Sequence, residues 1–253
     1  MKWLIPVLAL PILSLGRGVS AQSSFFDDFE SFDRERWFVS DGWTNGPHQN
    51  CWWSADALDL PGDGALSLRL RETGEADRPY ICAEIQTRER FHHGTFEVRM
   101  RTDRWSGVNA AFFTYIGPAH DAPHDEIDVE ILTRDPGEVA LNTFIGGEMR
   151  HGETIDLPVP ADDGFHDYAF TWEAERIRWF IDGELVHEAT GELPTHPQKI
   201  YLSHWSTDEL SDWMGPFAPP GRDLALEVDW VAWTAPGEGC AFPQSILCTE
   251  AAE

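Results

Sequence analysis

The sequence predicts an all-β protein, an antiparallel sandwich or barrel in one domain, and three observations support this. Apolar and polar side chains alternate with a period of two along many short segments, as in strands with one buried face. Gly, Pro and Asp turns separate these segments, and no long amphipathic helix, repeat or low-complexity linker interrupts them. The chain has 253 residues, enough for a sizeable core, and a β-sandwich of this length is commonly a single domain.

Individual segments show the alternation clearly. Residues 65–70 and 95–101 each place three apolar side chains on one face, so both are expected to be half-buried strands. Residues 178–180 and 185–187 flank Asp182-Gly183, the dipeptide preferred in a two-residue hairpin turn. In residues 224–233 the alternation sets Leu224, Leu226, Val228 and Trp230 against Glu227, Asp229 and Val231.

Residues 124–131 read HDEIDVEI and interleave three acids with three aliphatic residues. In a strand this spacing puts Glu126, Asp128 and Glu130 on one face and the aliphatic side chains on the other. Ile and Val favour strands, and no helical repeat runs through the segment. A solvated edge strand with an acidic face is the simplest interpretation of such a triplet. The rest of the sequence has to decide whether the acids have a function.

The composition restricts the possible partners. The net charge is −26, with 18 Lys+Arg against 44 Asp+Glu, and the only lysines are Lys2 and Lys199. Such an acidic surface repels phosphate backbones, which argues against nucleic acid as a partner. It also suits a saline habitat, where an acidic, lysine-poor surface stays soluble. The expected substrate is neutral or weakly charged.

The N-terminus has the pattern of a signal peptide. Lys2 precedes an apolar run from Trp3 to Leu15, and Val19-Ser20-Ala21 forms a small-residue cleavage site. A retained anchor is the alternative, but Arg17 interrupts the run too early for a membrane span. We therefore expect residues 1–21 to be removed and residues 22–253 to form one domain, secreted or periplasmic, with no membrane association after cleavage. Nothing in the sequence demands more than a monomer.

Four cysteines in an exported chain suggest two disulfides, for which three connectivities exist. Cys240 and Cys248 are close in sequence, so we pair them, which leaves Cys51 with Cys82. Zinc is the alternative, but no CxxC pair or His-x-His cluster supports it.

The chain is rich in aromatic residues, with 12 Trp and 15 Phe, and some of them are expected outside the core. Aromatic faces stack on sugar rings while carboxylates and amides bind hydroxyls, so a Trp-lined acidic cleft suits a neutral polysaccharide. Trp205 and Trp213 stand among Ser, Thr, Asp and Glu in the segment HWSTDELSDWMG. Core packing explains either Trp equally well.

Three carboxylates on one strand can hydrolyse a glycosidic bond. Hydrolysis with retention needs two carboxyl groups about 5–5.5 Å apart, one nucleophile and one acid. The Cα atoms of Glu126 and Glu130 would lie roughly 13 Å apart, a gap that two Glu side chains can largely close. The shorter Asp128 would stay back and hydrogen-bond to one of them. Crowding should raise the pKa of at least one acid, which supplies the protonated group that catalysis requires.

These residues resemble the glycoside hydrolase family 16 β-glucanases, whose signature is Glu-x-Asp-x-Glu on a concave strand of a concanavalin-like jelly roll. The resemblance extends over nearly the whole chain after residue 21, in the order of that family. The similar segments are SDGWTNGPHQNCWW (40–53), CAEIQT (82–87), GTFEVRMR (94–101), AFFTYIGP (111–118), FHDYAFTWEAERIRWFIDGELVH (165–187) and SDWMG (211–215). The resemblance implies a sandwich of two antiparallel sheets with a concave substrate cleft.

The resemblance also implies roles for individual residues. Glu126 would be the nucleophile, Asp128 the assisting acid and Glu130 the general acid/base, with no cofactor in catalysis. The residues that match cleft positions, together with His124 beside the acids, are Asn45, Glu84, Phe113, Tyr115, Asn142, Trp205 and Trp213. Cys51 and Cys82 match the disulfide of the family. Asp229 and the backbone of Gly64 match its structural calcium site; a solvated strand residue is the alternative for Asp229.

The sequence departs from lichenases at three places. His124 replaces a Trp, as in xyloglucan transglycosylases; Gln86 replaces an Arg; and Thr143-Phe144 replaces a Tyr pair. HPQKIYLSHWSTDELSDWMG and APGEGCAFPQSILC resemble the succinoglycan-depolymerising endo-1,3-1,4-β-glycanases of rhizobia and related bacteria. The expectation is an exported endo-β-glycanase acting on mixed-linkage glucan or exopolysaccharide. A transglycosylase and a non-catalytic glycan-binding jelly roll are the alternatives.

Overall fold

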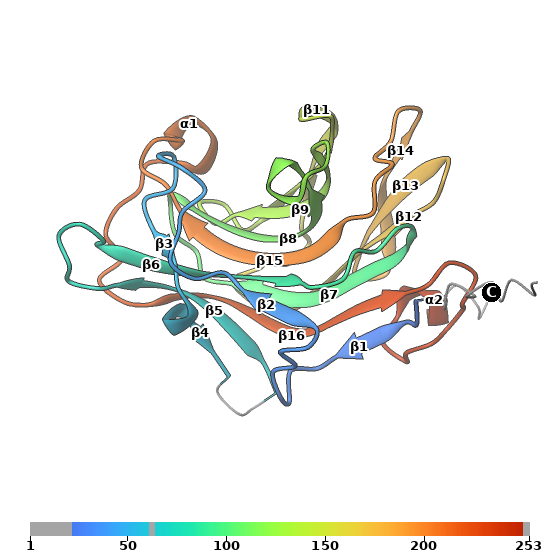
Figure 1. The fold of residues 1–253 in the computed structure, drawn as a ribbon, viewed down its shortest axis with the longest axis horizontal. Coiled ribbons are helices and arrows are strands. Elements are labelled where there is room, and N and C mark those ends of the chain that lie inside the picture. The colour runs from blue at the N-terminus through green and yellow to red at the C-terminus, as the bar shows by residue number, and fades with distance from the viewer. Residues whose placement is uncertain (1–21, 61–63, 250–253) are drawn as a thin grey trace, which may run out of the picture.

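The computed structural model describes residues 22–60 and 64–249 (Figure 1). The expected signal peptide, residues 1–21, lies outside these residues. In the described ranges no helix is long and apolar enough to cross a membrane.

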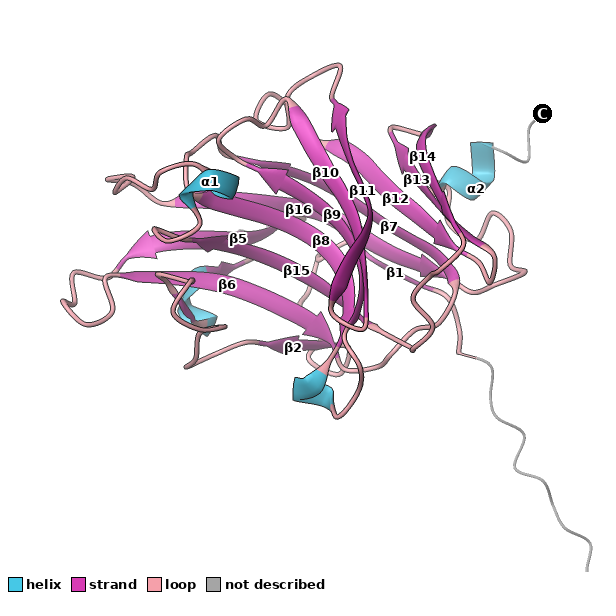
Figure 2. Ribbon diagram, turned by 90° about the horizontal axis from the view of Figure 1, so that it is seen from above, coloured by secondary structure: helices cyan, strands magenta, loops and turns pink. Residues whose placement is uncertain are grey.

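Strands form two curved layers packed face to face (Figure 1). The first layer consists, in spatial order, of β11 (Glu148–Asp156), β10 (Glu138–Ile145), β9 (Asp125–Leu132), β8 (Val108–Ile116), β15 (Lys199–Ser206) and β6 (Tyr80–Thr87). Two short strands, β2 (Trp37–Val39) and β3 (Trp52–Trp53), add to β6. Figure 2 shows the long strands of this layer side by side, seen from above.

The second layer consists of β5 (Leu66–Glu72), β16 (Leu224–Thr234), β7 (Gly94–Thr102), β12 (His166–Trp172), β13 (Arg176–Ile181) and β14 (Glu184–Thr190). The short strands β1 (Phe25–Asp27) and β4 (Leu58–Asp59) pair with β16 and β5. Helices are confined to short turns: α1 (Ser211–Met214), α2 (Ile246–Thr249), and the 3₁₀ turns η1 (Ala55–Ala57) and η2 (Pro118–His120). The expected all-β sandwich of mainly antiparallel strands is confirmed.

The core fills the space between the layers. Ile127, Val129 and Ile131 of β9 are at most 1% exposed, so the acids between them must face the other way. Phe112 of β8 packs against Phe170 of β12, with ring centroids 5.7 Å apart. The alternation in HDEIDVEI therefore separates core from concave surface, as expected.

The predicted strands and hairpin are present. Residues 66–70 of the predicted segment 65–70 lie in β5, residues 95–101 lie in β7, and Asp182 and Gly183 connect β13 to β14. Both turn residues have positive φ, 50° and 84°, as a type I′ turn requires.

The alternation predicted along residues 224–233 is wrong in its second half. The register of β16 against β7 shifts between Val228 and Trp230, so Asp229 is an extra residue in the strand. Beyond this bulge Val231 and Trp233 join the core, at 0% and 2% exposed, and Trp230 packs on Phe26 instead. A bulge adds one residue and thereby exchanges the faces of every residue after it.

Both expected disulfides are present. Cys51 bonds Cys82 across a sequence separation of 31, and Cys240 bonds Cys248 across 8. Cys51 and Cys82 are fully buried. Their bond links the segment before β3 to β6, a strand of the first layer.

Candidate active site

The strand register aligns the candidate residues in rows across the concave face. Glu126 of β9 pairs with Tyr115 of β8, and Asp128 pairs with Phe113. On the other side of β9, Asp128 pairs with Asn142 of β10. Because paired residues of neighbouring strands point to the same face, these side chains form one continuous surface.

This surface is a long cleft with the three acids at its middle. One half runs over β8, β15, β6 and β2, the other over β10 and β11, and Glu126, Asp128 and Glu130 line both halves. Every candidate cleft residue lines one half: Asn45, Glu84, Phe113, Tyr115, His124 and Trp205 the first, Asn142 and Trp213 the second. The structure therefore brings together the whole predicted set.

The third acid, Glu130, is held by two amides. Asn109 Nδ2 donates to Glu130 Oε1 at 2.9 Å, and Asn142 Nδ2 donates to Oε2 at 3.2 Å. Burial raises the pKa of Glu130 to about 7, the two amide bonds oppose this rise, and the charge of Glu126 adds to it. A carboxyl group with such a pKa holds its proton in weakly acidic solution and can release it during a reaction.

Asp128 is the most enclosed of the three, at 3% exposed. Burial raises its pKa well above the usual range; the charges of Glu126 and Glu130, and a hydrogen bond to Glu126, act in the same direction. The raised pKa favours the protonated form of Asp128, as the expected role of an assisting acid requires. The sequence predicted a raised pKa from the mutual repulsion of the three acids. The pKa of Asp128 is indeed raised, but burial is the largest cause and repulsion comes second.

His124 lies against the first acid. Its Nε2 is 2.6 Å from Glu126 Oε2, and its ring stacks on Phe144 with centroids 5.2 Å apart and 13° between planes. The hydrogen bond to Glu126 raises the pKa of His124, against the effect of burial. The imidazole is thus fixed in position by one carboxylate and one ring.

Sequence reasoning did not single out several residues that shape the cleft. Asp125, 2% exposed, accepts from the backbone N–H of Thr195 at 2.9 Å and from Gly146 N–H at 3.3 Å, which anchors the start of β9. Asn109 shares a strand face with Phe113 and Tyr115, so alternation could have identified it. Its contact with Glu130 depends on pairing between strands, which alternation does not give.

Glu84 is a further buried acid in the cleft. It is 6% exposed, and Ser40 Oγ lies 2.5 Å from its Oε1. Burial raises the pKa of Glu84 to about 7, although the bond from Ser40 opposes the rise. Glu84 pairs across strands with Ser203 of β15, so it faces the same surface as the three acids.

The candidate calcium residues lie on the other layer. Gly64 and Asp229 line one hollow together with Asp28 and Glu30, an oxygen-rich set that suits a hard cation. However, Arg99 Nε lies 3.2 Å from Asp229 Oδ2, and no cluster of three metal-binding side chains exists among the described residues. An ion here would need backbone oxygens and water to complete its shell, so calcium binding stays a prediction.

Comparison with known proteins agrees with this geometry. The sequence model of glycosyl hydrolases family 16 matches residues 45–232. The chain is 48% identical to endo-1,3-1,4-beta-glycanase ExoK of Rhizobium meliloti (strain 1021), over 89% of this chain and 84% of that protein. It is 37% identical to a beta-glucanase of Paenibacillus macerans, over 85% and 90%.

The fold agrees as well. The structure superposes on the Bacillus licheniformis beta-glucanase with a TM-score of 0.81 and 31% sequence identity, covering 85% of this chain and 99% of that one. Together, the family match, the identities and this superposition show that the chain is a glycoside hydrolase that belongs to glycosyl hydrolases family 16.

Proposed function

We propose that the protein is an exported, retaining endo-β-glycanase that hydrolyses 1,3-1,4-linked β-glucan or a succinoglycan-like exopolysaccharide. One observation carries this proposal: Glu126 and Glu130 stand at the middle of a cleft that continues on both sides of them. A chain lying across such a cleft is cut internally rather than at its end. The printed names of the relatives, an endo-1,3-1,4-beta-glycanase and several beta-glucanases, support the linkage class.

In this proposal Glu126 is the nucleophile. Its carboxylate attacks the anomeric carbon while the bond to the leaving oxygen breaks, and a covalent glycosyl-enzyme forms. Protonated Asp128 donates to Glu126 and so steadies its charge before attack. His124 holds the same carboxylate through its ring nitrogen.

Glu130 is the general acid/base. With a pKa near 7 it donates its proton to the leaving oxygen in the first step. Once ionised, it takes a proton from water in the second step, and that water releases the sugar with its original anomeric configuration. Both steps use carboxyl groups of the chain, so the proposal requires no cofactor.

The aromatic residues of the cleft would hold the sugars. Trp205 and Trp213 come from different segments, β15 and α1, and their ring centroids lie 6.2 Å apart. Trp213 is 37% exposed, so its face is free to stack on a sugar ring. Amide and carboxyl groups such as Asn45 and Glu84 would bind the hydroxyls.

A transglycosylase is the second candidate, favoured by His124 at the nucleophile. The same glycosyl-enzyme would then be resolved by a sugar hydroxyl instead of water. Adding a glucan oligosaccharide acceptor distinguishes the two reactions. Elongated products support transfer, and their absence at high acceptor concentration supports hydrolysis.

We also propose that calcium binds at the hollow of Gly64 and Asp229 as a structural ion. Calcium at a hundred times its dissociation constant would add about 2.7 kcal/mol to the free energy of unfolding. Thermal unfolding with calcium and with a chelator measures this, and Asp229→Asn should remove the difference. Equal unfolding temperatures with and without calcium would contradict the proposal.

The function is tested by product release from mixed-linkage 1,3-1,4-β-glucan, laminarin, xyloglucan and succinoglycan, with Glu126→Gln beside the wild type. Cleavage of mixed-linkage glucan or succinoglycan by the wild type alone is the expected result. No cleavage of either polysaccharide, or equal cleavage by Glu126→Gln, would overturn the proposal. Export is tested separately, by N-terminal sequencing of the mature protein, which should begin at Gln22.

A further inference from the structure

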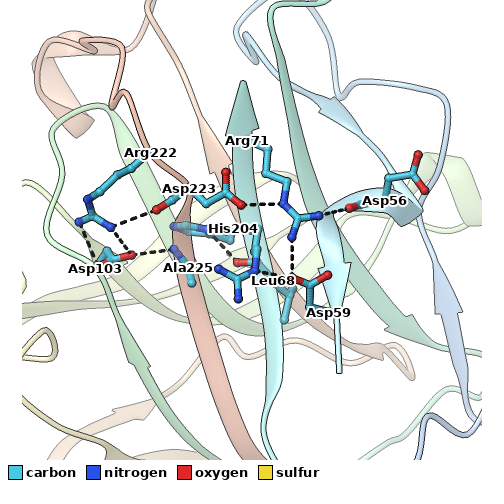
Figure 3. A network of polar contacts seen from close by, with 10 residues as sticks. Asp56, Asp59, Leu68, Arg71, Asp103, His204, Arg222, Asp223 and Ala225 are labelled. Carbon is cyan, nitrogen blue, oxygen red and sulfur yellow. Dashed lines mark hydrogen bonds and ion pairs between the residues drawn. The ribbon is translucent and has the colours of Figure 1, made fainter. Parts of the chain in front are cut away.

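Arg88 and Lys199, which line the cleft, and Arg90, which lies against His120, lack the carboxylate partner that most of the described arginines have. In the polar network of Figure 3, Arg71 pairs with Asp59 and Asp223, and Arg222 pairs with Asp103. Arg88, Arg90 and Lys199 form no ion pair with any described residue, although acids outnumber bases 44 to 18. Arg78 is unpaired too, but Arg88, Arg90 and Lys199 are close enough to one another to gather positive charge at one place.

That place is one rim of the cleft. Arg88 follows the end of β6, Lys199 begins β15, and both line the first half of the cleft together with His120 of η2. Lys199 pairs across strands with Tyr115, and Tyr115 pairs with Glu126. Two strand spacings separate Lys199 from Glu126, about 10 Å between Cα atoms. This is comparable to the length of a disaccharide.

Hydrogen bonds hold these groups in place and leave donors free. Lys199 Nζ donates to Gln86 Oε1 at 2.8 Å, and Tyr201 OH donates to the same oxygen at 3.2 Å. His120 Nε2 lies 2.8 Å from Tyr201 OH, and Arg90 Nη2 donates to the carbonyl oxygen of His120 at 3.1 Å. The bond to Gln86 uses one of the three ammonium hydrogens of Lys199, so two remain available to a ligand.

The cations are close enough to affect one another. Burial lowers the pKa of Lys199, and the charges of Arg90 and Arg88 lower it further. Burial likewise lowers the pKa of His120, with Lys199 and Arg90 acting in the same direction. Like charges gathered without a counter-ion repel, and a bound anion would relieve that repulsion.

We propose that Lys199, Arg88 and Arg90, with His120, form a subsite for a carboxylate group attached to the glycan. The preferred substrate would then be an acidic β-glycan rather than a neutral one, with its acid group about one disaccharide from the scissile bond. The inference rests on the proposed function and refines it. A long polyphosphate is a poor alternative ligand, because the net charge of −26 repels closely spaced negative charges.

The test compares three forms of one mixed-linkage glucan: neutral, partly oxidised at C6 to uronic acids, and partly succinylated. For each variant, kcat/KM on an acidic form is divided by kcat/KM on the neutral form, so that a general loss of activity cancels. The variants are Lys199→Met and Arg88→Gln. The control is Arg78→Gln, which removes the same charge from an unpaired arginine that lies over Trp52, 4.3 Å from the ring centroid.

We expect the ratio to fall about tenfold in Lys199→Met and in Arg88→Gln at low salt, and to stay at the wild-type value in Arg78→Gln. Added salt should lower the wild-type ratio toward that of the variants, because the subsite faces solvent. A fall confined to the oxidised form identifies a uronic acid as the ligand. A fall confined to the succinylated form identifies an acidic acyl group.

Two results would overturn the inference and leave the proposed function intact: an unchanged ratio in Lys199→Met, or an equal fall in Arg78→Gln. In both cases the wild type still cleaves the neutral glucan. If the wild type cleaves none of the three forms, both the proposed function and the subsite are contradicted.

Discussion

Two groups of carboxylates in this protein have opposite surroundings. Asp59, Asp103 and Asp223 lie on the outer side of the second layer, partly exposed, and each pairs with an arginine (Figure 3). Glu126, Asp128 and Glu130 lie in the cleft, with amides, a histidine and one another as neighbours.

The difference explains which acids can do chemistry. The paired acids contribute to structure through their ion pairs with arginine, which are worth about 1 kcal/mol or less at an exposed surface. Glu130 has no such partner, and burial raises its pKa to about 7. Keeping arginine and lysine away from Asp128 and Glu130 is therefore as important to the site as the acids themselves.

The largest expected effect comes from removing a carboxylate of the cleft. Glu130→Gln should lower kcat by about 10²–10⁴-fold, and Glu126→Gln by at least as much, because each acid takes part in bond breaking. Steady-state rates on mixed-linkage glucan measure the loss. Asp223→Asn, the same chemical change in the paired group, should leave kcat within twofold of the wild type, and a loss equal to that of Glu130→Gln would contradict the comparison.

The next effect concerns the loss of stability that follows from burying Glu84 without a cationic partner. The pKa of Glu84 rises from 4.5 to about 7 on folding, so its contribution to stability is complete below pH 4.5 and is lost as pH rises through 7. At pH 8 the loss amounts to about 3 kcal/mol of unfolding free energy. Urea unfolding at pH 5 and pH 8 should show a smaller decrease in Glu84→Gln than in the wild type. Equal decreases would contradict the assignment of the pKa.

A smaller effect tests the amides that hold Glu130. Because Asn142 donates to Glu130, the bond favours the ionised form, and its removal raises the pKa of Glu130 further. Asn142→Ala should move the alkaline limb of the profile of kcat/KM against pH upward by about half a unit to one unit, the equivalent of one hydrogen bond. A limb that stays in place, or moves down, would show that Glu130 is not the group titrating there.

The smallest effect is expected in the paired group. Arg71→Gln removes the ion pairs of Arg71 with Asp59 and Asp223, whose side chains are 36% and 44% exposed. The unfolding free energy should fall by about 1 kcal/mol or less, and by still less in high salt. The activity should not change. A loss of several kcal/mol would mean that this network contributes more to the fold than surface ion pairs do elsewhere.

The elements near the site were predictable to different degrees. The strand of the acids, the hairpin at Asp182-Gly183 and the disulfides follow from local pattern and spacing, and the structure has them. The bulge at Asp229 was missed, because an extra residue in a strand leaves no local signal in an alternating sequence. The contacts of Glu130 with Asn109, and of Lys199 with Gln86, depend on strand pairing over long sequence separations, which no local pattern specifies.

The central claim is that Glu126 and Glu130 act as nucleophile and acid/base in a retaining cleavage. The most direct test follows the anomeric protons by ¹H NMR as the enzyme cuts mixed-linkage glucan, before mutarotation mixes the products. The first reducing ends should be β, the configuration of the bond that was cut. An initial α signal would show inversion and would contradict the two-step mechanism.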